Sequence, residues 1–288
     1  MTRLAILSDI HGNSIALEAV LTDLAQFHVD QIVIAGDIIN WGPFSAPVVE
    51  RVAREGWPVI RGNSEYYLLD YDTPRAPIEW SEPGQFPLLP WLRRQLSGRC
   101  HNIVAGWPDT LSLRFPDAPP LRVVHGSPRD NKEPIFPSTA ESEINAMFAG
   151  VQEETIIAGH THITMDRRVA GRHIVNPGSA GNPVDGLFTV SYMLLDGNAE
   201  GWCATLRRVA FDYAPLFAEF ERQRFVDECG VIGKLVLEEF KTARLQVLPF
   251  IYWRMANCPQ APFTMSLFEE FSGADLWAYT PIDYHVNR

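Results

Sequence analysis

Short apolar segments in the first part of the chain repeatedly end in loops that carry Asp, Asn or His. Seven side chains occupy such positions: Asp9, His11, Asp37, Asn63, His125, His160 and His162. In parallel α/β sheets the carboxyl ends of the strands meet at one edge, and the loops that follow them form the ligand-binding crevice. We therefore expect these side chains to converge on one site, although they are spread over residues 9–162.

The donor atoms of this set are suited to divalent metal ions. Carboxylate and amide oxygens and imidazole nitrogens are ligands for Mn²⁺, Fe, Zn²⁺ and Mg²⁺. Seven donors exceed the need of one tetrahedral site, but they suit two ions if one carboxylate bridges them. An isolated histidine after a strand is usually structural, yet four of the eight histidines follow this pattern. The other four lack this setting and are assigned structural roles: His28, His101, His173 and His285.

The elements that must position these donors alternate between short β-branched strands and helices. Strands are predicted at residues 4–7, 32–35, 59–60, 111–115, 121–124, 155–158 and 173–175. Helices are predicted after Ser14 and over residues 45–55, 88–96 and 138–148. Ser14 can act as an N-cap, Gly56 can end the second helix, and Ser138 with Glu141 forms a capping box. Strands that alternate with helices imply a layered and largely parallel α/β core.

A β-hairpin is predicted to close this core. Residues 187–195 and 202–209 alternate like strands, and Asp196-Gly197 between them is a typical turn pair. The α/β core is accordingly expected to span residues 1–212.

The chain changes in character beyond this point. Residues 213–288 are rich in aromatic side chains and contain helical patterns at 213–224 and 231–245. We expect a mainly helical C-terminal appendage that forms a lid or one wall of a substrate pocket. Three of its aromatic residues could stack on a base, although such residues more often belong to a core: Phe250, Tyr252 and Trp253.

The net charge limits the classes of binding partner. The 288 residues include 24 Lys and Arg against 35 Asp and Glu, which gives a net charge of −11. This charge repels nucleic-acid phosphates and argues against a dedicated nucleic-acid-binding surface. It remains compatible with a small phosphate-ester substrate if metal ions neutralise the local field.

The sequence favours a cytoplasmic protein without membrane association. The apolar run at residues 4–7 is too short for a signal peptide, and no run approaches the length of a membrane span. The four cysteines form no C-x-x-C pair, which is typical of free thiols in a reducing compartment: Cys100, Cys203, Cys229 and Cys258. The sequence predicts no particular oligomeric state.

Taken in order, the donor motifs resemble those of the calcineurin-like metallophosphoesterases. The motifs are Asp9-x-His11, Gly36-Asp37, Gly62-Asn63, His125 and Gly159-His160-Thr161-His162. The similarity covers roughly residues 1–212, because NPGSAGNP at residues 176–183 is similar to the loop after the last ligand motif in small prokaryotic members. The resemblance is to the small phosphodiesterase-type branch, and it implies a four-layer α/β/β/α sandwich.

The resemblance also implies a role for each donor. Asp9, His11 and His162 would hold one divalent ion, and Asn63, His125 and His160 would hold the other. Asp37 would bridge the two ions, and Asp37 and Asn63 are the residues expected to be catalytic. Mn²⁺ is the preferred ion, with Fe, Zn²⁺, Ni²⁺ and Mg²⁺ as alternatives. Two such ions, about 3.5–4 Å apart, would lower the pKa of a shared water, and the resulting hydroxide would attack phosphorus.

Four further residues are candidates for contact with the substrate. Asn13, Arg61 and Ser127 flank the metal ligands, and Ser64 directly follows Asn63. Structural roles are equally open for Asn13, Arg61 and Ser127, because caps and turns use the same residue types.

Ser64 is a departure from the family pattern. Many members carry a histidine after Gly-Asn, followed by Asp or Glu, and that histidine is thought to protonate the leaving group. Here Glu65 keeps the acidic position, but a serine hydroxyl is a poor general acid, and loss of a positioned acid costs typically about 10²–10⁴-fold. We expect either another proton donor or substrates with good leaving groups. Small phosphodiesterase-type relatives also lack this histidine, which disfavours a calcineurin-type protein phosphatase.

Three functions are therefore considered. The first is a phosphoesterase acting on a small phosphodiester or phosphomonoester, such as a nucleotide or a cyclic nucleotide. The second is a protein serine/threonine phosphatase on the same core, which requires an open groove instead of a capped site. The third is a non-catalytic scaffold, which would be expected to have lost ligands. Since all seven ligand positions hold competent residues, the scaffold ranks last.

Overall fold

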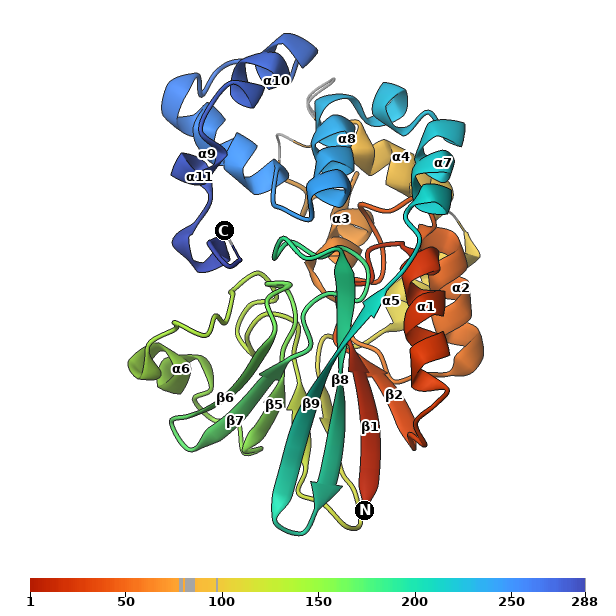
Figure 1. Cartoon of the computed structure of the whole chain (residues 1–288), viewed down its shortest axis with the longest axis vertical. Coiled ribbons are helices and arrows are strands. Elements are labelled where there is room, and N and C mark those ends of the chain that lie inside the picture. The colour runs from red at the N-terminus through yellow and green to blue at the C-terminus, as the bar shows by residue number, and fades with distance from the viewer. Residues whose placement is uncertain (78–79, 81–85, 97, 288) are drawn as a thin grey trace.

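Two β-sheets packed face to face form the centre of the molecule (Figure 1). The computed structural model describes residues 1–77, 80, 86–96 and 98–287. The first sheet has the strand order β2-β1-β8-β9. Its strands are β1 (Thr2–Leu7), β2 (Gln31–Ile34), β8 (Thr189–Asn198) and β9 (Gly201–Ala210). β1 and β2 are parallel, whereas β8 is antiparallel to both of its neighbours.

The second sheet has the strand order β3-β4-β5-β7-β6. Its strands are β3 (Leu111–Leu113), β4 (Leu121–Val123), β5 (Thr155–Ile157), β6 (Met165–Val169) and β7 (Arg172–Asn176). The three central strands are parallel, and the two outer strands pair antiparallel. β1, β2, β4 and β5 therefore present their carboxyl ends to loops that can meet, as the sequence pattern requires.

Apolar side chains fill the space between the two sheets. Leu4, Ile6 and Val33 from the first sheet and Val123 and Ile157 from the second belong to one buried cluster, each with no exposed surface. Because helices cover the outer faces as well, the central strands are buried on both sides and carry near-continuous apolar runs.

Helices complete the outer layers. α1 (Ser14–Leu24) and α2 (Ser45–Glu55) cover the first sheet, and α6 (Glu141–Met147) covers the second (Figure 1). Ile144 and Phe148 pack with residues of β5 and β7 in the cluster under α6. The predicted four-layer α/β/β/α sandwich is thereby confirmed, as is the helix over 45–55 with Gly56 at its C-terminus (φ 66°).

α5 (Arg99–Gly106) packs beside α2, and the remaining helices gather beyond the carboxyl ends of β1 and β2 (Figure 1). They are α3 (Asn63–Asp70), α4 (Leu88–Gln95), α7 (Ala214–Arg222), α8 (Phe225–Thr242), α9 (Val247–Asn257), α10 (Met265–Ser272), α11 (Leu276–Tyr279) and the 3₁₀ helix η2 (Ile282–Tyr284). The C-terminal region is helical, as predicted. Phe250 is fully buried and Trp253 is buried, whereas Tyr252 is 44% exposed. Phe250 and Trp253 are therefore core residues of this region.

The hairpin of β8 and β9 is longer than predicted, and its turn was placed wrongly. The strands pair up to Asn198 and Gly201, so Asp196 and Gly197 lie within β8. The side chain of Asp196 accepts a hydrogen bond from Arg3 Nε on β1 (2.6 Å), and this contact holds it in the sheet. A Cβ atom on Gly197 would lie 2.5 Å from the Cζ3 atom of the Trp202 ring, so the packing requires glycine at this position.

Three local predictions were also wrong. α1 is capped by Asn13, whose side-chain oxygen accepts from the N–H of Ala16 (3.0 Å), and Ser14 is its first residue. α6 begins after Ala140, whose N–H donates to Glu143, so Ser138 does not cap it. Val59 makes only an isolated parallel bridge to Ile34, so no strand forms at residues 59–60. At α1 and α6, a hydrogen-bonding residue one or two positions from the predicted cap decides the boundary.

Within the described part of the chain, no helix is both long enough and apolar enough to cross a membrane.

Candidate metal centre

The predicted donors are carried by loops at the carboxyl ends of four strands and by the first residue of α3. Asp9 and His11 follow β1, Asp37 follows β2, His125 follows β4, His160 and His162 follow β5, and Asn63 begins α3. The structure brings all seven side chains together. The loops are short and are tied to one another through the backbone, since the N–H of His11 donates to the carbonyl of Asp37 (2.9 Å).

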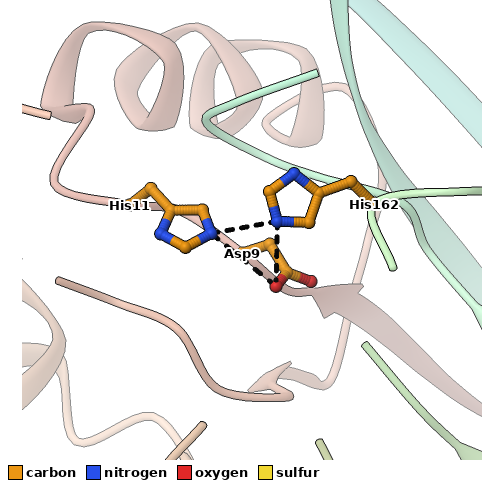
Figure 2. A group of neighbouring side chains, drawn as sticks. All are labelled: Asp9, His11 and His162. Carbon is orange, nitrogen blue, oxygen red and sulfur yellow. Dashed lines mark hydrogen bonds and ion pairs between the residues drawn. The ribbon is translucent and has the colours of Figure 1, made fainter. Parts of the chain in front are cut away.

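Asp9, His11 and His162 form the first group of donors (Figure 2). The Nε2 atom of His162 lies 3.0 Å from Nε2 of His11 and 3.4 Å from Oδ1 of Asp9. The other ring nitrogen of each histidine faces a backbone carbonyl: Ile39 for His11 (3.3 Å) and Asn182 for His162 (2.6 Å). When Nδ1 of each ring carries the proton and donates it to the carbonyl, both Nε2 lone pairs point into the same space. This is the tautomer that a metal-bound histidine adopts.

Asn63, His125, His160 and Asp37 form the second group. The Oδ1 atom of Asn63 lies 3.1 Å from Nε2 of His125 and 2.8 Å from Nδ1 of His160. His125 Nδ1 faces the carbonyl of Ala35 at 2.7 Å, so the same tautomer argument applies. Asp37 lies between the two groups, because Oδ1 is 3.3 Å from His125 Nε2 and Oδ2 is 3.6 Å from His11 Nε2. A carboxylate that bridges two ions requires such a position.

The donor set fits divalent cations on its own chemistry. Asp9 Oδ1 is a buried carboxylate oxygen with no hydrogen-bond partner, although buried polar atoms are normally paired. It lies within 4 Å of the Nε2 atoms of His11, His125 and His162. Lone pairs and a carboxylate oxygen that converge in this way repel one another, and a metal ion among them would remove the repulsion.

The electrostatics of the site also favour bound positive charge. Burial lowers the pKa of His11 and of His160 to about 4, so both rings are neutral at pH 7 and can act as ligands. Burial has the same tendency at His125, but the Asp37 carboxylate outweighs it and raises the pKa of His125 to about 10. A metal ion at this position would take the place of that proton.

The backbone of the centre is strained. Five of the ligand residues have positive φ, which is uncommon for residues other than glycine: Asp9, His11, Asp37, His160 and His162. Such conformations cost free energy and cluster at functional sites, where the surrounding structure enforces them. At Gly62 the backbone passes close to a ligand, because a Cβ there would lie 2.1 Å from Oδ1 of Asp37.

Ser64 and Glu65 hold Asp37 and its loop in place. The N–H and the hydroxyl of Ser64 both donate to the Asp37 carboxylate (2.8 and 2.9 Å). The Glu65 carboxylate accepts from the N–H groups of Gly62 (2.6 Å) and Ile38 (2.8 Å). Burial raises the pKa of Glu65 to about 7, and the nearby charge of Asp37 contributes to the rise. The structure thus places the Ser64 hydroxyl on a ligand carboxylate.

The other three candidate substrate contacts have structural partners. Asn13 is fully buried; besides capping α1, it donates to the carbonyl of Gly181 (2.8 Å). Arg61 pairs with Asp109 (2.9 Å), and the Ser127 hydroxyl donates to Glu133. None of the three is among the described residues that line the cavity in front of the metal centre.

That cavity has a volume of about 330 Å³. Five of the predicted ligands lie in its floor: His11, Asp37, Asn63, His160 and His162. Ile232, Leu248 and Tyr284 from the C-terminal region line its walls. The metal centre and the helices after residue 212 therefore share one cavity.

Two residues next to the centre, Asn182 and Glu239, were not among the predicted site residues. The backbone carbonyl of Asn182 orients His162, and the side-chain amide of Asn182 donates to Glu239 on α8 (3.4 Å). Asn182 lies in the NPGSAGNP segment, whose run of Asn, Gly and Ser could have indicated a loop that contacts the ligands. Glu239 follows another glutamate in an amphipathic helix, and no local signal distinguishes it.

Comparison with known proteins agrees with this geometry. The model of the calcineurin-like phosphoesterase superfamily domain matches residues 2–200. The uncharacterized protein MJ0912 of Methanocaldococcus jannaschii is 24% identical over 79% of this chain and 95% of its own length.

Two crystal structures share the fold over most of the chain. A metallophosphoesterase from Sphaerobacter thermophilus is 26% identical with a TM-score of 0.67, covering 84% of this chain and 100% of that one. The hypothetical protein PH1004 from Pyrococcus horikoshii OT3 is 19% identical with a TM-score of 0.69, covering 85% and 99%. Because the family model spans every ligand-bearing loop and more than half of the sequence, the chain belongs to the calcineurin-like phosphoesterase superfamily and is a metal-dependent phosphoric ester hydrolase.

Proposed function

We propose that the protein hydrolyses a small phosphodiester or phosphomonoester with the help of two divalent ions, preferably Mn²⁺. The observation that carries this proposal is the convergence of seven donors around Asp9 and Asp37, with Oδ1 of Asp9 buried and unpaired. Asp9, His11 and His162 would hold one ion, and Asn63, His125 and His160 the other, with Asp37 between them. When bound, the ions would polarise the phosphate oxygens and supply a nucleophile from water at neutral pH.

The chain's own residues would set the geometry of the reaction. Ser64 orients the Asp37 carboxylate through two hydrogen bonds, and the neutral amide of Asn63 adds no negative charge beside a phosphate. Since the Ser64 hydroxyl already donates to Asp37, it is not free to protonate a leaving group. We therefore expect faster hydrolysis of esters with leaving groups of low pKa, such as phenols.

The walls of the cavity favour a small substrate over a phosphoprotein. Helices α4, α8 and α9 wall the cavity in front of the donors, whereas a protein phosphatase needs an open groove. We propose that residues 213–288 act as one wall of the substrate pocket.

The net charge of −11 disfavours nucleic-acid partners. The four free cysteines are compatible with a cytoplasmic location, which we propose on that basis.

The test is hydrolysis of a substrate panel with each of Mn²⁺, Mg²⁺, Zn²⁺ and Ni²⁺. The panel contains bis-p-nitrophenyl phosphate, p-nitrophenyl phosphate, cyclic and linear nucleotides and a phosphopeptide. We expect Mn²⁺-stimulated hydrolysis of small esters that Asp37→Ala or Asn63→Ala abolishes.

Asp227→Ala is the matched control, because Asp227 makes an exposed ion pair with Arg224 remote from the centre. Unchanged turnover in both ligand variants would disprove the site assignment. Turnover of the phosphopeptide alone would favour the protein phosphatase. Protein that binds no divalent ion after incubation with Mn²⁺ would favour the scaffold.

A further inference from the structure

The walls of the cavity differ sharply in character from its floor. We call the walls the apolar chamber, defined by Leu88 and Leu89 of α4, Ile232 of α8, Leu245, and Leu248 and Ile251 of α9. Aromatic rings complete the lining, among them Trp41, Tyr67 and Tyr284. A ligand whose phosphate reaches the donors on the floor must therefore place its remaining atoms against hydrocarbon and ring faces.

The chamber lacks groups that could neutralise additional negative charge. Among the described lining residues there is no lysine or arginine. Residues 78–79, 81–85 and 97 contain none in their sequence either. A second phosphate or a carboxylate in the chamber would lose its hydration without gaining an ionic partner, which is costly.

Glu239, the one carboxylate besides Asp37 among the described lining residues, strengthens this discrimination. Glu239 is buried and accepts hydrogen bonds from the N–H groups of Gln246 (2.8 Å) and Val247 (3.0 Å) at the start of α9. Its hydrogen bonds connect α8, α9 and the loop of Asn182, so it holds the wall against the core. An anionic ligand group would meet this carboxylate and not a cation.

The size of the chamber limits the organic group. Ligand pockets typically measure about 300–1,000 Å³, and this cavity of about 330 Å³ is at the lower end of that range. It can accept one phosphate on the floor and one ring or small ring system above it. Aromatic walls favour such a ring, because ring pairs gain from edge-to-face and offset stacking.

We infer that the ester hydrolysed at this centre has one phosphate and, besides its leaving group, one uncharged, hydrophobic or aromatic organic group that enters the apolar chamber. This inference rests on the proposed function and specifies its substrate class. It predicts discrimination against nucleoside di- and triphosphates, against esters with carboxylate groups, and against phosphopeptides. Burial of one ring is expected to improve kcat/KM by roughly 10–100-fold over a methyl group.

Three diesters with the same leaving group test this selectivity. Each is a p-nitrophenyl phosphate whose second substituent is methyl, phenyl or 2-carboxyethyl, so that the bond broken and the product detected are identical. We expect kcat/KM for the phenyl diester to exceed that of the methyl diester at least tenfold, and the carboxyethyl diester to be the poorest. Equal kcat/KM for the methyl and phenyl diesters, or a preference for the carboxyethyl diester, would overturn the inference.

Substitutions in α9 assign the selectivity to the chamber. Leu248→Ala should lower the phenyl-to-methyl ratio of kcat/KM at least fivefold, and Leu248→Lys should improve the carboxyethyl diester relative to the phenyl diester. A ratio is used because a partly unfolded sample lowers all rates equally. Met255→Ala is the control, since Met255 is on the same helix, 61% exposed and outside the chamber, and its ratio should not change. The inference is contradicted if the phenyl-to-methyl ratio is unchanged in Leu248→Ala and the carboxyethyl-to-phenyl ratio is unchanged in Leu248→Lys.

Binding measurements separate this inference from the proposed function. Phenylphosphonate and methylphosphonate are titrated into Mn²⁺-loaded protein by calorimetry, which requires no turnover. Absence of hydrolysis of all three diesters and of p-nitrophenyl phosphate, combined with at least tenfold tighter binding of phenylphosphonate, would reject the proposed function and support the chamber. Equal affinities for the two phosphonates would reject the chamber whatever the turnover.

Discussion

The ligand loops and the apolar chamber meet at one cavity but are built on opposite principles. In the ligand loops, polar side chains are held by strained backbone, short connections and directional hydrogen bonds, as at Asp37, whose carboxylate accepts twice from Ser64. In the chamber, helices present apolar side chains, and the packing of α8 and α9 depends on non-directional burial of residues such as Phe240 and Phe250.

This contrast separates reaction chemistry from selectivity. A ligand displaced by about 1 Å can cost about 10²-fold in rate, because metal chemistry depends on exact geometry. An apolar wall tolerates changes in side-chain shape at lower cost, and each change alters the fit of the organic group. Substitutions in the loops should therefore reduce the hydrolysis of all esters equally, while substitutions in the chamber should change their ranking.

Gly62→Ala is the most severe test of the ligand loops. The added Cβ would lie 2.1 Å from Oδ1 of Asp37, so the carboxylate must move although the backbone of Gly62 is extended (φ −101°, ψ −166°). We expect a loss of about 10²-fold or more in kcat/KM for every ester, with reduced Mn²⁺ content by elemental analysis. Gly106→Ala is the control, because a Cβ at Gly106 meets no atom within 4 Å. A change in ester ranking in Gly62→Ala would contradict the assignment of selectivity to the chamber and of reaction chemistry to the ligand loops.

Glu65→Gln tests the support of the same loop without a change in size. The two carboxylate oxygens accept four backbone N–H groups, including those of Gly62, Asp37 and Ile38. The amide nitrogen of glutamine would face N–H groups as a second donor. We expect a loss of about 10–100-fold in Mn²⁺ affinity by calorimetry, the usual effect of removing a group that supports metal ligands.

The matching control for that prediction is Glu200→Gln, the same chemical change at an exposed position of the β8–β9 turn. Metal affinity should be unchanged in Glu200→Gln. If Glu65→Gln also binds Mn²⁺ as the unmodified protein does, the loop does not need the carboxylate.

Ser64→Ala should have a smaller effect. The substitution removes the hydroxyl hydrogen bond to Asp37 (2.9 Å) but keeps the bond from the backbone N–H (2.8 Å). We expect a loss of about tenfold in kcat/KM, at the lower end of the range for such supporting groups. The phenyl-to-methyl ratio should stay constant, as should the rate of Ser272→Ala, an exposed control on α10. An unchanged rate in Ser64→Ala would show that the backbone bond alone orients Asp37.

The same contrast explains what the sequence could predict. The ligand loops follow recognisable strands within a few residues, so local patterns were sufficient to identify Asp9, His11 and the other donors. The sandwich was implied by the family resemblance that these motifs carry. The chamber depends on the packing of α4 against α8, which are separated by more than 120 residues along the chain. No local pattern encodes such a contact, and Glu239 and Asn182 were accordingly missed.

The ends of the helices and strands, and the shortest elements, could not be predicted from local patterns either. The prediction at residues 59–60 treated two β-branched residues as a strand, but Arg61 N–H donates to Pro108 and α3 starts at Asn63. β6 was not predicted, because three of the five residues in Met165–Val169 are charged and the strand pairs only with β7. The turn of the β8–β9 hairpin depends on Trp202 and on Arg3. Arg3 is almost 200 residues away from its partner Asp196 along the chain.

Asp23→Asn is expected to have the smallest effect on activity, because Asp23 belongs to neither the ligand loops nor the apolar chamber. Asp23 on α1 accepts from the hydroxyl of Tyr192 (2.6 Å) and from Arg207 (2.9 Å), away from the cavity. Burial disfavours its charged form, but the hydrogen bonds from Arg207 and Tyr192 outweigh this and lower the pKa of Asp23. The stability from this cluster is therefore present above the unfolded pKa of 3.8 and lost as pH falls through the lower folded value.

We expect Asp23→Asn to lower the free energy of unfolding by about 1–3 kcal/mol at pH 7, measured by urea denaturation. The difference from the unmodified protein should remain constant down to about pH 4 and shrink at lower pH. The kcat/KM of all three diesters and their ranking should not change, because neither the ligand loops nor the chamber contacts Asp23. A changed ranking in this variant would mean that the chamber responds to the stability of the whole core, and selectivity would then not belong to the chamber alone.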